Sequence, residues 1–160
     1  MSGLLTQDVI DAIEAKDSIK VVATISKEGI PHVAVKGSIT LTEDGRIRFL
    51  EYLEKSQTQK NLVYAIWFQK QIAVNIITAD GRSYQIKGVP ERTVNAGREF
   101  LDEYQKVQDK FGRDFDLSSI WYINVESVEE ESLFVRREKL EALYPNEIHV
   151  DRIAKDEYRR

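Results

Sequence analysis

The sequence predicts a mostly β protein, namely an antiparallel β-barrel with helices inserted between its strands. Six or so segments alternate between apolar and polar residues or are dense in β-branched residues. Turn sequences such as Asp44-Gly45 and Asp80-Gly81 join them as hairpins, which favours an antiparallel barrel over a doubly wound parallel sheet. Segments with helical spacing are too few for a helix bundle.

Composition indicates one soluble globular domain, since the 160 residues are 42% hydrophobic and carry a net charge of −4. This acidic balance argues against a nucleic-acid partner, because phosphate binding relies on a basic surface. The absence of cysteine excludes disulfides, thiolate zinc sites, iron–sulfur clusters and a cysteine nucleophile. Acidic residues among the apolar ones of residues 1–16 argue against a secretory signal or a membrane span. We therefore expect a cytoplasmic protein that does not enter a membrane.

The predicted elements follow one another closely. They are a helix after Thr6 that ends near Asp17; strands over residues 19–26, 32–42 and 46–53; a helix over residues 56–68; strands over residues 72–78 and 83–93; a helix between Asn95 and Gly112; and a strand over residues 119–128. Alternation over residues 32–42 predicts an apolar face made of Val33, Val35, Gly37, Ile39 and Leu41. Pro90 is expected to end the strand pairing locally.

The C-terminal part of the chain is less regular. We expect residues 1–137 to form the barrel domain, with residues 132–135 extending the sheet, and residues 138–160 to form a charged extension of the same domain. Two interpretations of residues 136–160 stay open. They form either a short helix with an extension that packs on a partner chain, or a loose tail.

No self-contained catalytic motif is present. The sequence has no Gly-x-Gly-x-x-Gly, Walker, Gly-x-Ser-x-Gly or His-Glu-x-x-His pattern. Its two histidines, His32 and His149, are far apart in the sequence, so we expect no metal site, and no catalytic residue is identified. Any reaction would then depend on a bound cofactor, with the chain supplying binding and orientation.

The best candidate for holding such a cofactor is the strand-to-helix junction at residues 56–61. It carries Ser56, Gln57, Thr58, Lys60 and Asn61. The N-terminus of a helix exposes unpaired N–H groups and partial positive charge, and therefore binds phosphate readily. Ser56 followed three residues later by a glutamine also fits a capping box, and the two interpretations are compatible.

Five segments together resemble the pyridoxamine 5'-phosphate oxidase-like FMN-binding split-barrel family, over about residues 8–135. They are Val21-Val22-Ala23-Thr24-Ile25, Gly29-Ile30-Pro31-His32-Val33, Val35-Lys36-Gly37-Ser38, Lys55-Ser56-Gln57-Thr58-Gln59-Lys60-Asn61-Leu62 and Tyr84-Gln85-Ile86-Lys87-Gly88. The resemblance implies a six-stranded Greek-key split barrel. It also implies a homodimer, with one FMN per subunit in a cleft between the chains.

The resemblance also implies which residues hold FMN. The phosphate loop would be Ser56, Gln57 and Thr58, with Asn61 one turn further on. The strand beside the isoalloxazine ring would be formed by Val35, Lys36, Gly37 and Ser38. Gly37 lets the backbone approach a flat ring, and Lys36 and Ser38 would meet its carbonyl edge or the phosphate. Trp121, together with Tyr84 and Tyr122, would cover the ring, although a place in the core or the dimer interface stays open for all three.

One departure limits what the resemblance implies. Gln57 and Thr58 stand where the oxidase has a basic pair, which puts activity on a phosphorylated vitamin in doubt. The expected function is therefore a flavin-dependent oxidoreductase that acts on an unidentified small molecule or electron donor. The alternatives are a non-catalytic flavin carrier or sensor, a haem-binding split barrel with His32 or His149 as ligand, and a dimeric barrel with an empty groove.

Overall fold

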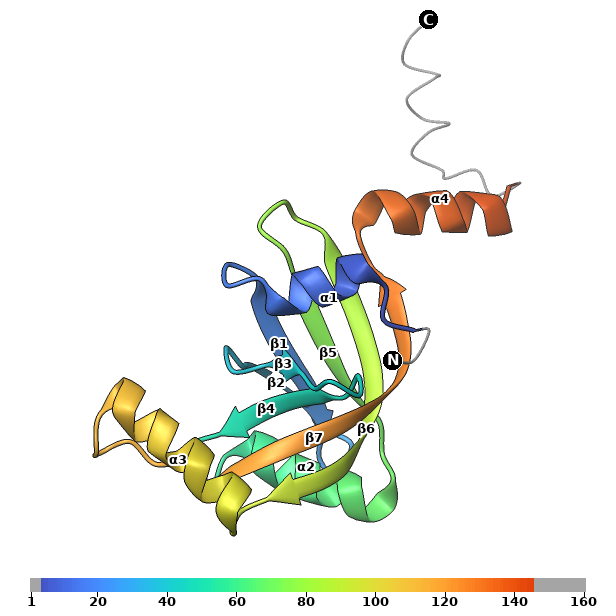
Figure 1. Ribbon diagram of the computed structural model, residues 1–160. Helices are drawn as coiled ribbons and strands as arrows, with labels where there is room; N and C mark the ends of the chain where they lie inside the picture. Colours follow the sequence, from blue (N-terminus) through green and yellow to red (C-terminus); the bar gives the residue numbers. More distant parts are fainter. Residues whose placement is uncertain (1–3, 146–160) are drawn as a thin grey trace, which may run out of the picture.

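The computed structural model describes residues 4–145 and has one seven-stranded antiparallel sheet with four helices (Figure 1). In chain order the elements are α1 (Gln7–Glu14), β1 (Ile19–Ile25), β2 (Pro31–Val35), β3 (Thr40–Leu41), β4 (Ile47–Glu51), α2 (Gln57–Phe68), β5 (Ile72–Ile77), β6 (Ser83–Val94), α3 (Arg98–Phe111), β7 (Ser119–Glu130) and α4 (Leu133–Leu143). The mostly β barrel class with inserted helices is confirmed, with seven strands in place of six.

The order of the strands forces the sheet to curl. Strands β2 and β3 lie at its two edges, in the order β2-β1-β5-β6-β7-β4-β3. In a flat sheet these edges would be six spacings, or roughly 29 Å, apart. Only residues 36–39 join β2 to β3, and even an extended chain from Val35 to Thr40 spans no more than about 18 Å. The two edges must therefore come close together, which gives an open barrel.

The barrel encloses the main hydrophobic core. The inward sides of β4 and β7 contribute Phe49 and Trp121, which lie opposite each other in the register and are both fully buried. Helix α1 adds Val9, Ala12 and Ile13, and helix α2 adds Leu62 and Ala65. Figure 1 shows α1 across one end of the barrel and α2 across the other. The two helices therefore close the ends that the curled sheet leaves open.

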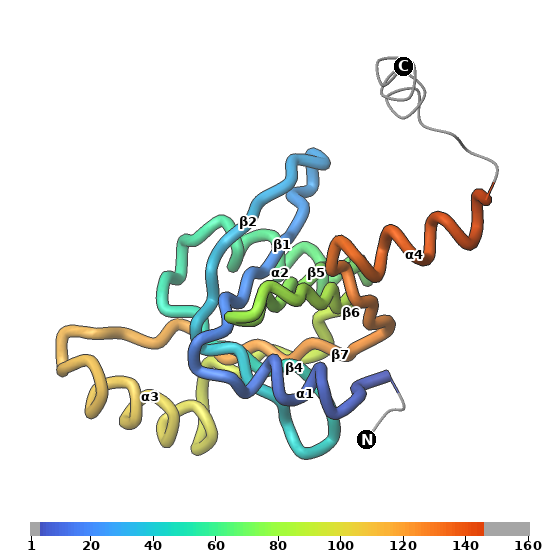
Figure 2. The backbone as a smooth tube through the Cα atoms, turned by 90° about the horizontal axis from the view of Figure 1, so that it is seen from above, coloured from blue at the N-terminus to red at the C-terminus, as the bar shows by residue number. Residues whose placement is uncertain are grey.

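A second, smaller core lies on the outer side of β4 and β7, under α3. Leu50, Ile120 and Tyr122 point outward from these strands and pack with Leu117 and with Val107 of α3. Val107 is the only buried residue of α3, so this helix is less firmly packed than α1 or α2. Figure 2 shows α3 and α4 leaving the barrel on opposite sides.

Strands β6 and β7 approach each other unusually closely. A Cβ added at Gly88 would lie 2.3 Å from the carbonyl oxygen of Asn124 and 2.9 Å from the Ile123 side chain, so only glycine fits there. The register between the two strands shifts at this point and again between Pro90 and Arg92. Pro90 thus disturbs the ladder, as the sequence predicts, but it does not end it, since pairing continues to Val94.

The single strand predicted over residues 32–42 is divided in two. Strand β2 ends at Val35, Gly37 and Ser38 form a turn closed by a hydrogen bond from Ile39 N–H to the Lys36 carbonyl, and β3 begins at Thr40. The predicted apolar face is also divided, because Ile39 is buried whereas Val33 and Val35 are 64% and 69% exposed. Alternation alone does not show that the chain changes from one edge of the sheet to the other here.

The predictions for the helical ends and the C-terminal segment need correction as well. Helix α3 begins at Arg98 with Gly97 as its N-cap, not at Asn95, although Gly112 ends it as predicted. Residues 132–135 do not extend the sheet but open α4, which runs to Leu143 and so crosses the expected boundary at residue 137. The rest of the predicted extension, including His149, lies outside the described residues. No helix within residues 4–145 is long and apolar enough to cross a membrane.

Candidate functional site

Three clefts surround the N-terminus of α2 and the turn that follows β2. The large cleft, of about 800 Å³, is lined by Tyr52, Leu53, Glu54, Lys55, Ser56, Gln59, Asn95, Phe100, Asp116, Leu117 and Ser118. The turn cleft, of about 460 Å³, is lined by Gly37, Ser38, Thr40, Arg48, Leu50, Tyr52, Glu103, Lys106, Val107, Lys110 and Phe111. The hairpin cleft, of about 230 Å³, is lined by Ser26, Lys27, Glu28, Gln57, Lys60, Asn61 and Tyr64. The large cleft has the volume of a cofactor-sized site.

The N-terminus of α2 has the open donors that the sequence predicts. Ser56 is the N-cap, and its hydroxyl accepts a hydrogen bond of 3.0 Å from the Gln59 N–H. The Ser56 N–H donates to the Leu53 carbonyl. Within residues 4–145, the N–H groups of Gln57 and Thr58 have no acceptor, as expected for the first turn of a helix. The junction therefore offers two unpaired donors next to Ser56, which lines the large cleft, while Gln57 lines the hairpin cleft.

The side chain of Gln59 does not complete the capping box. Its Oε1 accepts hydrogen bonds from Trp121 Nε1 at 2.7 Å and from Ser119 Oγ at 3.0 Å. These contacts tie the first turn of α2 to β7 and fix the edge of the large cleft. Gln59 is a lining residue that sequence reasoning missed as a site residue, although the capping-box pattern had already singled it out.

Lys36 has a different environment from the one predicted. Its ammonium group lies 2.6 Å from the carboxylate of Glu51, and the two side chains are only 12% and 2% exposed. Glu51 also accepts a hydrogen bond from the Leu53 N–H, and Ser38 exchanges hydrogen bonds with the backbone of Leu50. Lys36 is therefore neither a solvated charge nor a free cation; it anchors the turn at residues 36–39 to β4.

The structure separates the other predicted site residues. Gly37 and Ser38 line the turn cleft, Ser56 lines the large cleft, and Gln57 and Asn61 line the hairpin cleft. Val35 points outward from β2, while Thr58 is 1% exposed and Trp121 is fully covered. Asn61 is buried and hydrogen-bonded to Thr24 and Gln57. These residues surround one corner of the barrel, but they do not share one cavity.

Tyr52 connects two of the clefts and was not singled out from the sequence. It lines both the large cleft and the turn cleft, and its ring makes edge contacts with Phe111 and Phe115. Burial raises the pKa of Tyr52 above its usual value, so its hydroxyl remains protonated at neutral pH. The sequence signal that could have pointed to this region is Glu51, a carboxylate in the inward-facing series Ile47, Phe49 and Glu51, which requires a buried partner.

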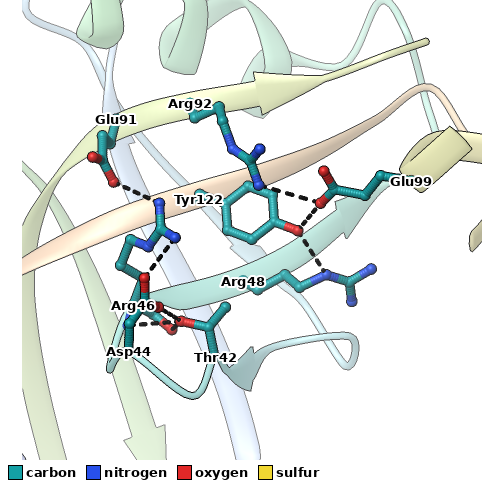
Figure 3. Close-up of polar contacts among 8 residues, drawn as sticks. All are labelled: Thr42, Asp44, Arg46, Arg48, Glu91, Arg92, Glu99 and Tyr122. Carbon is teal, nitrogen blue, oxygen red and sulfur yellow. Dashed lines mark hydrogen bonds and ion pairs between the residues drawn. The ribbon is translucent and has the colours of Figure 1, made fainter. Parts of the chain in front are cut away.

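A polar cluster on the outer face of the sheet holds α3 in place (Figure 3). The ring of Tyr122 lies between two guanidinium groups, with Cζ of Arg92 at 4.3 Å and Cζ of Arg46 at 5.5 Å from its centre. The Tyr122 hydroxyl donates to Glu99, the first-turn carboxylate of α3. Arg92 also pairs with Glu99 at 3.3 Å. Since α3 contributes Phe100 to the large cleft, this cluster fixes one of its walls.

A second ion pair completes the attachment of α3. Arg48 of β4 lies 2.7 Å from Glu103, and the two side chains are 20% and 16% exposed. Both residues line the turn cleft. The walls of the two clefts therefore depend on polar contacts between α3 and the sheet as well as on the apolar packing of Val107 and Phe100 in the second core.

Metal chemistry finds no support within residues 4–145, where no group of three or more potential metal ligands is present. His32 is the only histidine among these residues and lines none of the three clefts. It pairs with Thr24 in the β1–β2 ladder, which agrees with a structural strand residue.

Comparison with known proteins gives matches only among solved structures, since no family model and no curated protein sequence matches the chain. HupZ of Group A Streptococcus is 21% identical with a TM-score of 0.63, over 80% of this chain and 94% of HupZ. An FMN-binding protein from Syntrophomonas wolfei is 10% identical with a TM-score of 0.59, over 81% and 85% of the two chains. A putative pyridoxamine 5'-phosphate oxidase from Lactobacillus delbrueckii is 20% identical with a TM-score of 0.56, over 78% and 93%.

The same fold also occurs in HutZ, described as the haem storage protein of Vibrio cholerae. HutZ is 11% identical with a TM-score of 0.54, over 79% of this chain and 94% of HutZ. At these identities the matches establish the fold and not the ligand. Together with the curled antiparallel sheet, they show that this chain has the split-barrel fold of the pyridoxamine 5'-phosphate oxidase-like proteins.

Proposed function

We propose that this protein binds FMN as a homodimer and acts as a flavin-dependent oxidoreductase on a small molecule. The observation that carries the proposal is the open N-terminus of α2, whose cap residue Ser56 lines a cleft of about 800 Å³ and whose next two N–H groups have no acceptor within residues 4–145. A structural neighbour described as an FMN-binding protein supports the choice of ligand. When bound, FMN supplies the redox chemistry by accepting and returning electrons or a hydride.

The phosphate of FMN is held by α2. The N–H groups of Gln57 and Thr58 donate to its oxygens, and the partial positive charge of the helix end favours its negative charge. Thr58 acts through its backbone, because its side chain is buried. Among the described residues, Lys55 is the only cationic side chain that lines the large cleft, whose lining also includes the carboxylates of Glu54 and Asp116. Phosphate binding at this end therefore depends on the helix N-terminus and on Lys55.

The isoalloxazine ring lies toward the turn at residues 36–38. Gly37 and Ser38 line the turn cleft, and Gly37 has no neighbour within 4 Å of an added Cβ, so a flat ring can approach the backbone. Lys36 holds this turn in position through Glu51, and the protonated hydroxyl of Tyr52 is a further donor between the two clefts. Trp121 supports the site from the core by fixing Gln59.

The outer side of β1 and β2 provides the dimer interface. Its exposed apolar residues, which we call the β1–β2 face, are Ile19, Ile25, Val33 and Val35. An exposed group of this kind on an edge strand favours association with another chain. Val35, which the resemblance places beside the cofactor, belongs to this face. A cofactor bound next to it would therefore lie close to the second subunit.

The direct test is titration of the purified protein with FMN, followed by flavin fluorescence and by thermal unfolding. Replacing Ser56 with Asp separates phosphate binding from helix capping. Asp is as good an N-cap as Ser, so stability is retained, whereas its carboxylate repels a phosphate. We expect the Kd for FMN to rise by about tenfold or more, the equivalent of losing one charge-assisted hydrogen bond.

Thr6→Asp is the matched control, because it places the same carboxylate at the N-cap of α1, across the other end of the barrel. It should leave the Kd for FMN unchanged. Equal affinity of Ser56→Asp and wild type would overturn the placement of the phosphate. Absence of any FMN binding, or a haem spectrum in the purified protein, would overturn the proposal itself.

A non-catalytic flavin carrier is the second candidate, and the same site would serve it. The two differ in turnover. An oxidoreductase reduces an artificial acceptor at the expense of a reduced nicotinamide, whereas a carrier shows no rate above that of free flavin. The measurement is the loss of nicotinamide absorbance with FMN-loaded wild type and with Ser56→Asp, which should lose the rate together with the flavin.

A further inference from the structure

Helix α4 has no packing partner within the described residues. None of its residues is buried, and its apolar side chains Leu133, Phe134 and Leu143 are 74%, 80% and 70% exposed. Figures 1 and 2 both show it running away from the barrel after the end of β7. A helix of 11 residues is marginal in water unless an apolar side packs against something. The helix therefore requires a surface that residues 4–145 of the same chain do not supply.

The direction of α4 is nevertheless fixed where it leaves the sheet. The Ser132 hydroxyl accepts from the Ser83 N–H at 3.1 Å and donates to Glu130 at 2.8 Å. Arg136 in the first turn pairs with Glu131 at 2.9 Å. These contacts cover none of the apolar side chains of α4. They hold the helix in an outward direction, as expected of an arm that contacts another molecule.

Three leucines of α4 and its C-cap Tyr144 lie on one side of the helix, whereas Phe134, Val135 and Ala142 point to other sides. Leu133, Leu140 and Tyr144 follow one another at spacings of seven and four residues, and Leu143 adjoins them. These four residues, all at least half exposed, are called the arm face. Ala142 lies on the opposite side. A partner surface that receives the arm face must itself be apolar, because none of these side chains makes a polar contact suited to a charged surface.

The chain carries a matching surface in the β1–β2 face. Val33 and Val35 stand beside Ala23 and Val21 in the β1–β2 register, and Ile19 and Ile25 extend the same apolar area along β1. In a two-fold dimer the arm of each copy lies on the β1–β2 face of its partner, so that both arm faces and both β1–β2 faces are covered. A foreign partner on α4 would leave the β1–β2 face exposed. One kind of association, between two copies of this chain, covers both.

Charge is consistent with the same choice of partner. Helix α4 carries three basic and two acidic residues, whereas the whole chain has a net charge of −4. Helix α4 thus has a net charge of +1 in an acidic chain, so charge favours its approach to a second copy.

We infer that α4 is an exchanged arm, whose arm face docks on the β1–β2 face of a second copy of this chain. The inference rests on the homodimer of the proposed function and adds to it the segment that joins the two subunits. It does not depend on the cofactor.

The test uses cross-linking, because the chain has no cysteine and each introduced thiol is unique. Full-length Leu140→Cys and Val33→Cys variants, carrying different tags, are mixed, left to exchange subunits and treated with a short thiol-specific cross-linker. We expect a covalent dimer that contains one chain of each variant. Leu101→Cys replaces Val33→Cys in the control, since Leu101 on α3 is equally exposed at 64%, and it should give no such dimer.

A second measurement keeps the result independent of cross-linking chemistry. Leu140→Asp should raise the dimer dissociation constant by about tenfold or more in analytical ultracentrifugation, since it places a charge in an apolar contact. Ala142→Asp adds the same charge on the opposite side of α4 and should leave the constant unchanged. Circular dichroism checks that both variants are folded.

The outcomes separate the arm from the dimer. A wild-type dimer that gives no cross-link between positions 140 and 33, and that Leu140→Asp leaves intact, would overturn the arm and keep the homodimer. A wild-type protein that stays monomeric at all concentrations would overturn both. Cross-links of equal yield with Leu101→Cys would also overturn the arm, because contact would then be random.

Discussion

The outer face of the sheet is built in opposite ways in its two halves. Along β4, β6 and β7 it carries Tyr122 between two arginines, and α3 covers it through Glu99 and Glu103. Along β1 and β2 it carries exposed Val33 and Val35, and no described element covers them. The first face is completed within the chain. The second is left uncovered by residues 4–145, which is why we propose it as the interface.

This difference also separates the stability of the subunit from its association. Tyr122 is 5% exposed and contributes to the second core, so its contacts are present in the single chain. The β1–β2 face contributes little to the folding of one subunit, because its side chains remain in water. Substitutions on the first face should therefore change unfolding, and those on the second should change the oligomeric state.

The largest expected effect is a loss of unfolding free energy on the face that α3 covers. Tyr122→Ala removes a buried ring together with its hydrogen bond to Glu99, and should lower the free energy of unfolding by about 3–5 kcal/mol. Leu101→Ala, at an exposed position of α3, should change it by no more than about 0.5 kcal/mol. Urea unfolding followed by circular dichroism measures both. Equal losses would show that α3 does not depend on this cluster.

The next effect is on the uncovered face. Val33→Asp should raise the dimer dissociation constant by about tenfold or more, because a carboxylate is costly to bury without a partner. The unfolding of the separated subunit should change by no more than about 0.5 kcal/mol, since position 33 is 64% exposed. Leu101→Asp is the control of equal exposure. Light scattering over a range of concentrations reports the mass, and a Val33→Asp protein that remains fully dimeric would contradict the assignment of this face.

The smallest effect concerns the acid stability of the covered face. Hydrogen bonds from Arg46, and then from Thr42, lower the pKa of Asp44 from 3.8 to about 2. A depressed pKa adds stability above the unfolded value, and this contribution is lost as the pH falls from about 4 to about 2. Asp44→Asn should therefore show a weaker decrease in melting temperature over this range than wild type. Parallel curves for the two proteins would show that Arg46 does not hold this carboxylate in solution.

Much of the fold could be predicted from local patterns. Ser56 as the cap of α2, Gly112 at the end of α3 and the turns at Asp44-Gly45 and Asp80-Gly81 all depend on nearest neighbours, which a sequence displays directly. A short helix after residue 136 was one of two open interpretations, but the start of α4 was missed because Leu133 to Val135 have the composition of a strand.

The candidate site was predictable in place but not in detail. The end of α2 that we propose as the phosphate site was singled out from hydroxyl and amide residues at a strand-to-helix junction, which is local chemistry. The partners of Lys36 and Gln59 did not follow, because Glu51 is 15 residues from the first and Trp121 is 62 residues from the second. The periodicity of apolar residues in a sequence does not indicate which distant side chains meet in the barrel.

By itself, therefore, the sequence determined the hairpins, the barrel class and the capped N-terminus of α2 that we propose as the phosphate site, since each depends on residues a few positions apart. The tertiary structure alone decided that β2 and β3 take opposite edges, that Lys36 turns inward to Glu51 and that Trp121 is enclosed in the core. It also decided that Ile39 is buried whereas Val33 and Val35, in the same alternating series, are exposed. The physical reason is that burial depends on closure of the whole sheet, and each strand pattern is compatible with either face until the sheet has curled.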